Sequence, residues 1–315
     1  MYNIGVDIGG TNIKCGLVDD KGNILYKEKI KTKKQVEPSV LIADIESMIQ
    51  STRINGKVKL SEINSIGIGV PGICNENVGE VRFCANINFK NVPLVDILSK
   101  KLNFKNMYLS NDANCAVLAE SLFGAAKGSK DCVLITIGTG IGTGIISEGK
   151  FIKGRAGLGA EGGHTIIEIG GKKCGCNELG HYEAYASTTA ILKQTQAAIE
   201  KNPNGILAKM GKEKVSGYTV FEAERAGDKE ATKVIDQFLE YVAIGAQNFA
   251  VLFAPEYIIL GGAISNEGER LTKPVEKYLS EHLFFRGHVE IPKVVTSNIK
   301  NDAGIIGAAY LYTQR

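Results

Sequence analysis

Two stretches of the sequence share one pattern: an apolar strand, a glycine-rich turn and a second apolar strand. The first stretch is residues 3–19, NIGVDIGGTNIKCGLVD, and the second is residues 131–147, DCVLITIGTGIGTGIIS. Apolar residues that alternate on both sides of a short turn predict a β-hairpin. Because the two copies lie far apart in the chain, they predict two similar α/β lobes rather than a short solenoid repeat.

The segments around these hairpins read as alternating strands and helices. Strands are predicted at 24–30, 63–70, 106–110 and 256–260, and helices at 37–52, 111–124, 182–200, 219–226, 228–253 and 301–312. This alternation is typical of α/β proteins. The predicted smaller lobe comprises residues 1–115 plus 298–315, with the final helix from Asp302 packing back on it, and the larger lobe comprises residues 116–297.

Composition excludes several classes of protein. The net charge of +3 in 315 residues is too small for a nucleic-acid binder, and the basic run KEKIKTKK at 27–34 reads as a strand with a solvated face. The chain shows no secretory leader and no apolar run long enough to span a membrane, so no membrane partner is expected. Seven cysteines, most of them single within apolar segments, indicate reduced thiols and a cytoplasmic location.

Three glycine-rich segments are candidates for binding phosphate. The segment GIGVPG at 67–72 has the spacing of a dinucleotide fingerprint, but the polar, strand-like ICNENVGEVRF follows it instead of a helix. The two hairpin turns lack the pattern of a P-loop. They nevertheless offer backbone N–H groups, with side-chain donors from Thr11, Asn12 and Thr139, while Asp7 is placed to hold Mg²⁺ through water. Two ordinary hairpins are the alternative, and the third glycine turn LGGAIS at 260–265 favours a nucleotide.

Two other features carry chemistry. The segment CGCNELGHYE at 174–183 supplies Cys174, Cys176 and His181, which is three of the four ligands of a closed zinc site. Asp112 follows a predicted strand and begins a predicted helix. Its carboxylate suits either a helix N-cap or a general base that takes a proton from a hydroxyl, and the sequence alone leaves both open.

The motifs DIGGT, GVPG, NDAN, TIGTGIG, AEGGH and CGCNELGHYEAYAS, in this order, resemble the ROK family (repressors, open reading frames, kinases). Within that family the chain is most similar to bacterial glucokinases, over essentially its whole length. The resemblance implies the two-lobe actin- and hexokinase-like fold, related to ribonuclease H, with the active site in the interlobe cleft. It also implies that ATP, with Mg²⁺, phosphorylates a hexose, and glucose at O6 is the first expectation.

The resemblance assigns roles to individual residues. It implies that Asp112 is the catalytic base and that the sugar is held by Asn86, Asn111, Asp112, Glu161, His164 and Glu183. It places the phosphates of ATP at the two hairpin turns and the third glycine turn, with the adenosine site in the larger lobe. The nucleotide-binding residues implied in this way are Asp7, Gly9, Gly10, Thr11, Asn12, Lys14, Gly138, Thr139, Gly140, Gly142, Gly261 and Gly262.

The family pattern also supplies a fourth metal ligand, His164, which lies ten residues before Cys174. This sequence departs from the pattern twice, because His181 stands where a cysteine is expected and Asn177 replaces a glycine. Zn²⁺ accepts imidazole as well as thiolate, so His164, Cys174, Cys176 and His181 are expected to hold a structural zinc ion. A strand at 165–171 is expected to bring His164 back to the cysteines. A degenerate loop without metal is the alternative.

Other functions remain as alternatives at this point. The alternatives within the kinase class are other hexose substrates: N-acetylmannosamine, fructose or allose. A sugar-sensing repressor is disfavoured because DIGGT begins at residue 7, which leaves no room before it for a helix-turn-helix. A filament-forming protein on the same fold would not need the glutamate and histidine set. The dimers of the family make a homodimer the expected assembly.

Overall fold

The computed structural model describes residues 1–84, 87–212 and 215–314, which form two compact units. Unit 1 comprises Met1–Cys132, Gly144–Ala160 and Asn298–Arg315, and unit 2 comprises Val133–Thr143 and Glu161–Ser297. The predicted smaller lobe ends at residue 115, whereas unit 1 continues to Cys132 and takes in Gly144–Ala160. The functional division into lobes stays a prediction.

Unit 1 is built around a five-stranded sheet with the order β3-β2-β1-β4-β8. The first predicted hairpin is present, because β1 and β2 pair antiparallel, whereas β4 runs parallel to both β1 and β8. In β3, partly buried and exposed residues alternate, as expected of a strand with one solvated face. The bounds of the strands are β1 Tyr2–Ile8, β2 Asn12–Val18, β3 Ile24–Lys31, β4 Ile63–Val70 and β8 Met107–Asn111.

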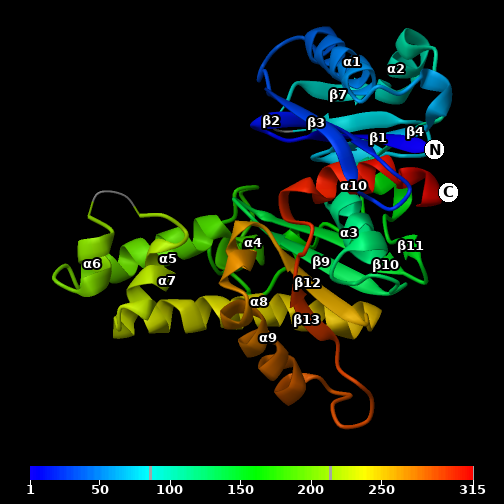
Figure 1. Cartoon of the computed structure of the whole chain (residues 1–315). Helices are drawn as coiled ribbons and strands as arrows, with labels where there is room; N and C mark the ends of the chain where they lie inside the picture. The colour runs from blue at the N-terminus through cyan, green and yellow to red at the C-terminus, as the bar shows by residue number, and fades with distance from the viewer. Residues whose placement is uncertain (85–86, 213–214, 315) are drawn as a thin grey trace. The chain divides into compact units, whose positions relative to one another are not determined.

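Helices cover both faces of this sheet (Figure 1). The helix α1, Pro38–Asn55, packs on β2 and β3, while α10, Ala303–Ala309, packs on β1 and β4 and against α3, Asp112–Phe123. The helix α2, Leu94–Leu102, contacts α1. A small sheet, β5-β6-β7, completes unit 1; its strands are Ile73–Asn75, Glu80–Cys84 and Phe89–Val92. The predicted return of the final helix to the N-terminal part of the chain is therefore confirmed.

Glycines let α10 lie unusually close to the sheet. Gly5 and Gly67 are direct neighbours on β1 and β4. A Cβ atom added to Gly5 would lie 1.8 Å from the carbonyl oxygen of Ile305, and one added to Gly67 would lie 1.7 Å from that of Ala308. Since both carbonyl oxygens belong to the backbone of a packed helix, neither can shift without disturbing the packing of the whole helix.

We therefore expect Gly67→Ala to destabilise the protein by about 3 kcal/mol, at the upper end of the usual cost of overpacking a core. Chemical denaturation measures the change in the free energy of unfolding. Gly138→Ala is the matched control, since a Cβ added there has its nearest neighbour at 3.9 Å. Equal stability of the two variants would contradict the close packing of α10.

The second five-stranded sheet has the order β11-β10-β9-β12-β13. The second predicted hairpin corresponds to the neighbouring strands β9 and β10. The strands β12 and β13 are parallel, and β10 and β11 are antiparallel. The bounds are β9 Cys132–Ile137, β10 Ile141–Ser147, β11 Lys150–Phe151, β12 Tyr257–Gly261 and β13 Lys293–Thr296.

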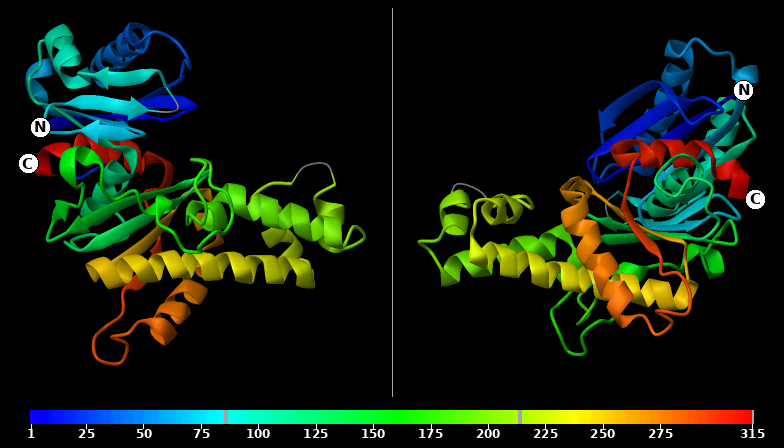
Figure 2. Two further views of the ribbon diagram at one scale, coloured as in Figure 1. Left: turned by 180° about the vertical axis from the view of Figure 1, so that it is seen from behind. Right: turned by 60° about the horizontal axis from the view of Figure 1, so that its bottom comes forward.

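Helices make up most of the rest of unit 2, and the long α8 contacts both α5 and α9 (Figure 2). The helix predicted at 182–200 is divided at Ser187, whose hydroxyl accepts the N–H of Ala190 and so caps a new helix. The helix α9, which buries Leu271, Val275 and Leu279, was not predicted. The bounds are α4 Glu183–Ala186, α5 Thr188–Lys201, α6 Ile206–Met210, α7 Thr219–Arg225, α8 Lys229–Phe253 and α9 Glu269–His282.

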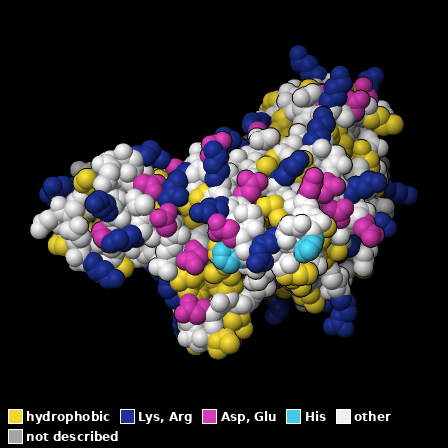
Figure 3. Space-filling model, turned by 90° about the horizontal axis from the view of Figure 1, so that it is seen from below, with side chains coloured by type: hydrophobic (Ala, Val, Ile, Leu, Met, Phe, Trp, Pro, Cys, Tyr) yellow, Lys and Arg dark blue, Asp and Glu magenta, His cyan; other side chains and the backbone are white. Residues whose placement is uncertain are grey.

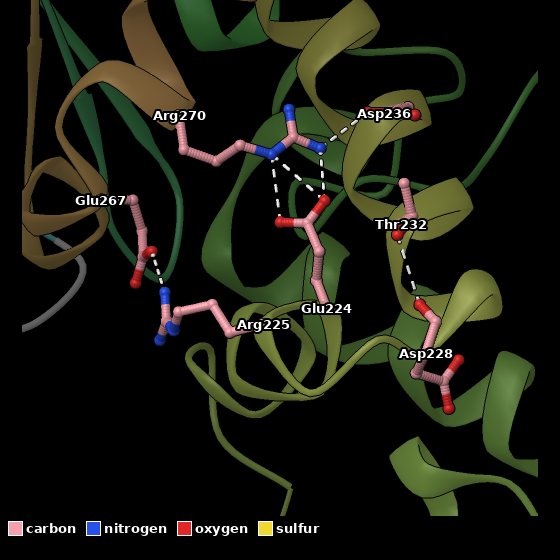
Figure 4. Close-up of polar contacts among 7 residues, drawn as sticks. All are labelled: Glu224, Arg225, Asp228, Thr232, Asp236, Glu267 and Arg270. Atoms are coloured by element: carbon pink, nitrogen blue, oxygen red, sulfur yellow. Dashed lines mark hydrogen bonds and ion pairs between the residues drawn. The ribbon is translucent and has the colours of Figure 1, made fainter.

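An ion-pair network joins three of these helices (Figure 4). Arg270 of α9 contacts Glu224 of α7 and Asp236 of α8, each at 2.7 Å. Asp228 caps α8 by accepting the N–H of Glu230, and its other oxygen accepts the N–H of Leu207 in α6 at 2.7 Å. These contacts fix the helical part of unit 2 without using any predicted site residue.

On the face shown in Figure 3, basic and acidic side chains are interspersed. Among the residues that the structure describes, no helix combines the length and the apolar character that crossing a membrane would require.

Candidate functional site

The first glycine turn, residues 9–12, is held in shape by short hydrogen bonds within unit 1. The N–H of Gly9 donates to the carbonyl oxygen of Asn12 at 2.9 Å. Thr32, just after β3, donates its N–H to the carbonyl oxygen of Thr11 at 2.9 Å and its hydroxyl to that of Gly9 at 2.6 Å. The side chain of Thr11 is exposed. A fixed turn with exposed donors suits the binding of an anion.

Asp7 lies beside this turn, at the end of β1. Its Oδ2 is 3.0 Å from Nζ of Lys14, which also donates to the carbonyl oxygen of Asn301 at 3.0 Å. A Cβ atom on Gly304 would lie 2.6 Å from Cγ of Asp7, so the start of α10 closes one side of the carboxylate. The Asp7 side chain is still 16% exposed, and its hard oxygen donors fit a water-mediated Mg²⁺ contact.

The junction of β8 and α3 carries the candidate base. Asn111 is the N-cap of α3: its Oδ1 accepts the N–H of Ala113 at 2.8 Å, and its Nδ2 donates to the carbonyl oxygen of Gly72 at 3.0 Å. Asp112 is the first residue of the helix. The alternative in which Asp112 serves as the N-cap is therefore wrong, because Asn111 fills that role.

Three carboxylates of unit 1 act electrostatically on one buried thiol. Burial raises the pKa of Cys115 well above its usual value, and the charges of Asp7, Asp112 and Glu76 raise it further. These carboxylates come from β1, the start of α3 and the segment after β5. Asn86, the further predicted sugar contact, lies outside the described residues.

The second glycine turn, residues 138–140, belongs to unit 2 and is fastened to the start of α5. The N–H of Gly138 donates to the carbonyl oxygen of Gly140 at 2.9 Å, and that of Thr188 donates to the carbonyl oxygen of Gly138 at 2.8 Å. The hydroxyl of Thr189 donates to the carbonyl oxygen of Thr139 at 2.6 Å. The turn is therefore held by the helix that follows Glu183.

The third glycine turn lies next to the second one. Gly261 ends β12, and Gly262 has a φ of +91°. A Cβ atom on Gly262 would lie 2.2 Å from the carbonyl oxygen of Ile137, the residue before Gly138. Gly142, on β10, accepts the hydroxyl of Thr136 at its carbonyl oxygen. The predicted nucleotide-binding glycines of unit 2 are thus neighbours in space.

The four predicted metal ligands form one cluster. One ligand atom from each of His164, Cys174, Cys176 and His181 lies within 4.8 Å of all the others. Sγ of Cys176 is 3.2 Å from Nδ1 of His181, and Sγ of Cys174 is 3.9 Å from Nδ1 of His164. Donor atoms around a tetrahedral zinc ion lie roughly 3.5 Å apart, so two thiols and two imidazoles at these separations fit Zn²⁺.

The chain reaches this arrangement without the predicted strand at 165–171, which is wrong. Only isolated bridges are present, between Ile166 and His181 and between Lys173 and Leu179. Gly170 has a φ of +66°, which favours a turn and interrupts an extended strand. The bridge at Ile166 nevertheless places His181 beside the chain that leaves His164.

Two glutamates adjoin the metal cluster. Oε2 of Glu183 accepts the N–H of Ile141 at 3.0 Å, and its Oε1 is 3.4 Å from Sγ of Cys174. Loss of hydration raises the pKa of Glu161; His164 lowers it and Glu183 raises it. Burial raises the pKa of Cys174 to about 11. Zinc binds the thiolate, so metal and protons compete for this sulfur. Glu161, His164 and Glu183 therefore share one site beside the second glycine turn.

The ROK family model matches residues 3–315 of this chain. The chain belongs to the ROK family. It is 37% identical to the glucokinase of Thermotoga maritima, over 99% of this chain and 97% of the relative. The glucokinase of Streptomyces coelicolor is 32% identical, over 98% of this chain and 96% of that protein. The predicted resemblance to bacterial glucokinases is confirmed.

Solved ROK structures confirm the predicted fold. A ROK glucokinase from Streptomyces griseus in complex with glucose and AMPPNP has a TM-score of 0.82 and 32% identity, with 99% of each chain covered. A ROK transcriptional regulator, a homologue of the E. coli MLC protein, has a TM-score of 0.88 and 28% identity, with 99% of this chain and 78% of that chain covered. This ROK protein thus has the two-lobe, actin-like sugar kinase fold.

Several residues that hold these segments in place were not predicted from the sequence. Thr188 and Thr189 fasten the second glycine turn, and Glu76 and Ser110 contact each other beside the candidate base. Serines, threonines and single glutamates are common on protein surfaces, so nothing in their spacing marked them. Only the hydrogen-bond partners reveal their positions.

Proposed function

We propose that this ROK protein is an ATP-dependent hexose kinase that converts glucose to glucose 6-phosphate. The observation that supports this most directly is the grouping of Glu161, His164 and Glu183 beside the second glycine turn. Carboxylates are acceptors suited to sugar hydroxyls, the free ring N–H of a metal-bound imidazole is a donor to them, and an adjacent turn of backbone N–H groups suits phosphates. The likeness to a glucokinase that binds glucose and AMPPNP supports the same assignment.

The proposed mechanism gives each group one task. Asp112 accepts the proton of the attacking sugar hydroxyl, and Asn111, Glu161 and Glu183 orient the sugar ring. The glycine turns bind the phosphates of ATP. Mg²⁺, held through water by Asp7, would neutralise charge on the transferred phosphoryl group. The zinc ligands order the chain between Glu161 and Glu183, so zinc has a structural role in this proposal.

A panel of free hexoses tests the proposal directly. We expect ATP consumption with glucose at a higher kcat/KM than with N-acetylmannosamine, fructose or allose, and a product phosphorylated at O6. Faster turnover of one of the other hexoses would keep the kinase and change the substrate. No sugar-dependent ATP consumption with any hexose would overturn the proposed function.

A repressor is the second functional class among the relatives. The xylose repressor of Caldicellulosiruptor bescii is 27% identical over 96% of this chain but 76% of its own length. The glucokinase matches are of higher identity and span nearly the whole relative, which favours the enzyme. We further propose a cytoplasmic homodimer without a nucleic-acid partner, and light scattering of the purified protein tests the dimer.

Glu161→Ala is expected to raise the KM for the sugar roughly tenfold or more while leaving the KM for ATP nearly unchanged. The reason is that sugar hydroxyls lose their acceptor, at a cost of about 1–3 kcal/mol. Glu183→Ala should raise both values, because Glu183 also holds the N–H of Ile141 beside the second glycine turn. Steady-state kinetics with each substrate varied in turn separate the two patterns. Equal changes in both KM values for Glu161→Ala would argue against sugar contact.

A further inference from the structure

Glu76 ties three separate segments of unit 1 together. It lies just after β5, and its Oε1 accepts the hydroxyl of Ser110, the residue before Asn111 and Asp112. Its Oε2 is 2.7 Å from Nζ of Lys153, which follows β11. The carboxylate thus contacts β8, the strand that leads into the candidate base, on one side and a lysine on the other.

Burial makes these contacts energetically significant. Ser110 is 0% exposed, and the Glu76 side chain is 14% exposed. Removing one partner from a hydrogen bond in such surroundings leaves a buried polar atom unsatisfied, which is costlier than losing an exposed pair. Nearby, the Nδ2 group of Asn111 donates to the carbonyl oxygen of Gly72. Glu76 therefore holds Ser110, and Gly72 holds Asn111, at the junction of β8 and α3.

We propose that Glu76 is a positioning residue for the phosphoryl-transfer step. By holding Ser110, it fixes the position and orientation of Asp112 at the start of α3. This inference rests on the proposed kinase function. Glu76 acts through Ser110, and no contact with a substrate is assigned to it. A displacement of about 1 Å in a catalytic group lowers turnover by as much as roughly a hundredfold. The contact of Glu76 with Ser110, two residues before the base, is called the clamp below, and its loss should have a large effect on kcat.

Lys153 offsets the negative charge that Glu76 brings close to the carboxylate of the candidate base. Glu76 contacts Ser110, two residues before Asp112, and the charges of Glu76 and Asp112 both raise the pKa of the buried Cys115 thiol. The ammonium group of Lys153 offsets the charge of Glu76 at 2.7 Å. A lysine removed alone leaves an uncompensated, nearly buried carboxylate beside the candidate base, whereas removing both charges together leaves none.

Five variants test the positioning role. Glu76→Ala and Ser110→Ala should each lower kcat roughly tenfold to a hundredfold while changing the KM values for sugar and ATP less than about threefold. Glu76→Gln keeps an acceptor for the Ser110 hydroxyl and should retain a larger kcat than Glu76→Ala. Lys153→Met should lower kcat, and Glu76→Gln combined with Lys153→Met should restore part of the loss, which is the non-additivity expected of contacting residues.

Hydrogen exchange supplies a readout that does not depend on activity. Peptides covering residues 110–115 should exchange faster in Glu76→Ala and Ser110→Ala than in the unaltered protein, whereas peptides from β1 should not change. Unchanged exchange at 110–115, or an unchanged kcat in an active enzyme, would overturn the clamp. If the unaltered protein phosphorylates no hexose, the proposed function fails by itself, and the exchange measurement still decides the clamp.

Discussion

Asp112→Asn is expected to lower kcat by about 10²- to 10⁴-fold, the usual contribution of a positioned general base. The amide keeps the size of the carboxylate and most of its hydrogen bonding, but it cannot take the proton from the sugar hydroxyl. Sugar binding should stay close to that of the unaltered protein. Stopped-flow or coupled assays at saturating substrates measure kcat, and equilibrium titration measures the affinity for the sugar.

In this experiment, loss of the general base can be separated from loss of the helix cap. Asn111 is the N-cap of α3, so the helix keeps its cap when Asp112 is changed. The thermal midpoint of Asp112→Asn should therefore shift little, and Asn111→Ala is the matched variant that removes the cap. If Asp112→Asn keeps more than about a tenth of the original kcat, Asp112 is not the base.

Loss of the metal is expected to weaken sugar binding roughly ten- to a hundredfold, since sugar hydroxyls lose ordered partners. Protein purified without chelator should contain about one zinc ion per chain, held by His164, Cys174, Cys176 and His181. Because the ion and the fold of this segment depend on each other, its removal should disorder the chain between Glu161 and Glu183. Elemental analysis and sugar titration of metal-free protein measure both effects.

Two substitutions at one position sharpen the zinc prediction. His181→Cys restores the ligand type of the family pattern and should retain zinc, whereas His181→Ala should bind it far more weakly. Nucleotide binding at the first glycine turn, which lies in unit 1, serves as the internal control and should survive. Fully active, well-folded protein without stoichiometric metal would show that the cluster has no structural ion.

Most of the fold was accessible from the sequence because its signals are local. Alternating apolar residues with glycine turns predicted both hairpins, and the strands at 63–70 and 106–110 follow from short apolar runs. The four metal ligands came from the combination of the CGCNELGHYE spacing and the family pattern, and the structure brings their donor atoms together. The catalytic and substrate-binding roles assigned to individual residues stay predictions.

The features that could not be predicted depend on contacts between distant segments. Whether Asn111 or Asp112 caps α3 is decided by the geometry of one turn, and both residue types suit the position. The contact of Glu76 with Ser110 spans 34 residues, and nothing in the sequence around either residue indicates it. The expected strand at 165–171 does not form because the chain turns at Gly170, despite the three isoleucines of TIIEI.

The close packing of α10 on the glycines of β1 and β4 affects the order in which the parts of the protein can fold during biosynthesis. Residues 303–309 are translated after β1 and β4, so the sheet face that carries Gly5 and Gly67 stays uncovered until α10 has left the ribosome. Unit 2, which ends at Ser297, is complete before that moment. A ribosome stalled before α10 emerges should therefore hold a folded unit 2 and an N-terminal sheet with an exposed apolar face. Such a sheet should be sensitive to proteases and prone to aggregate, and chaperones bind species of this kind.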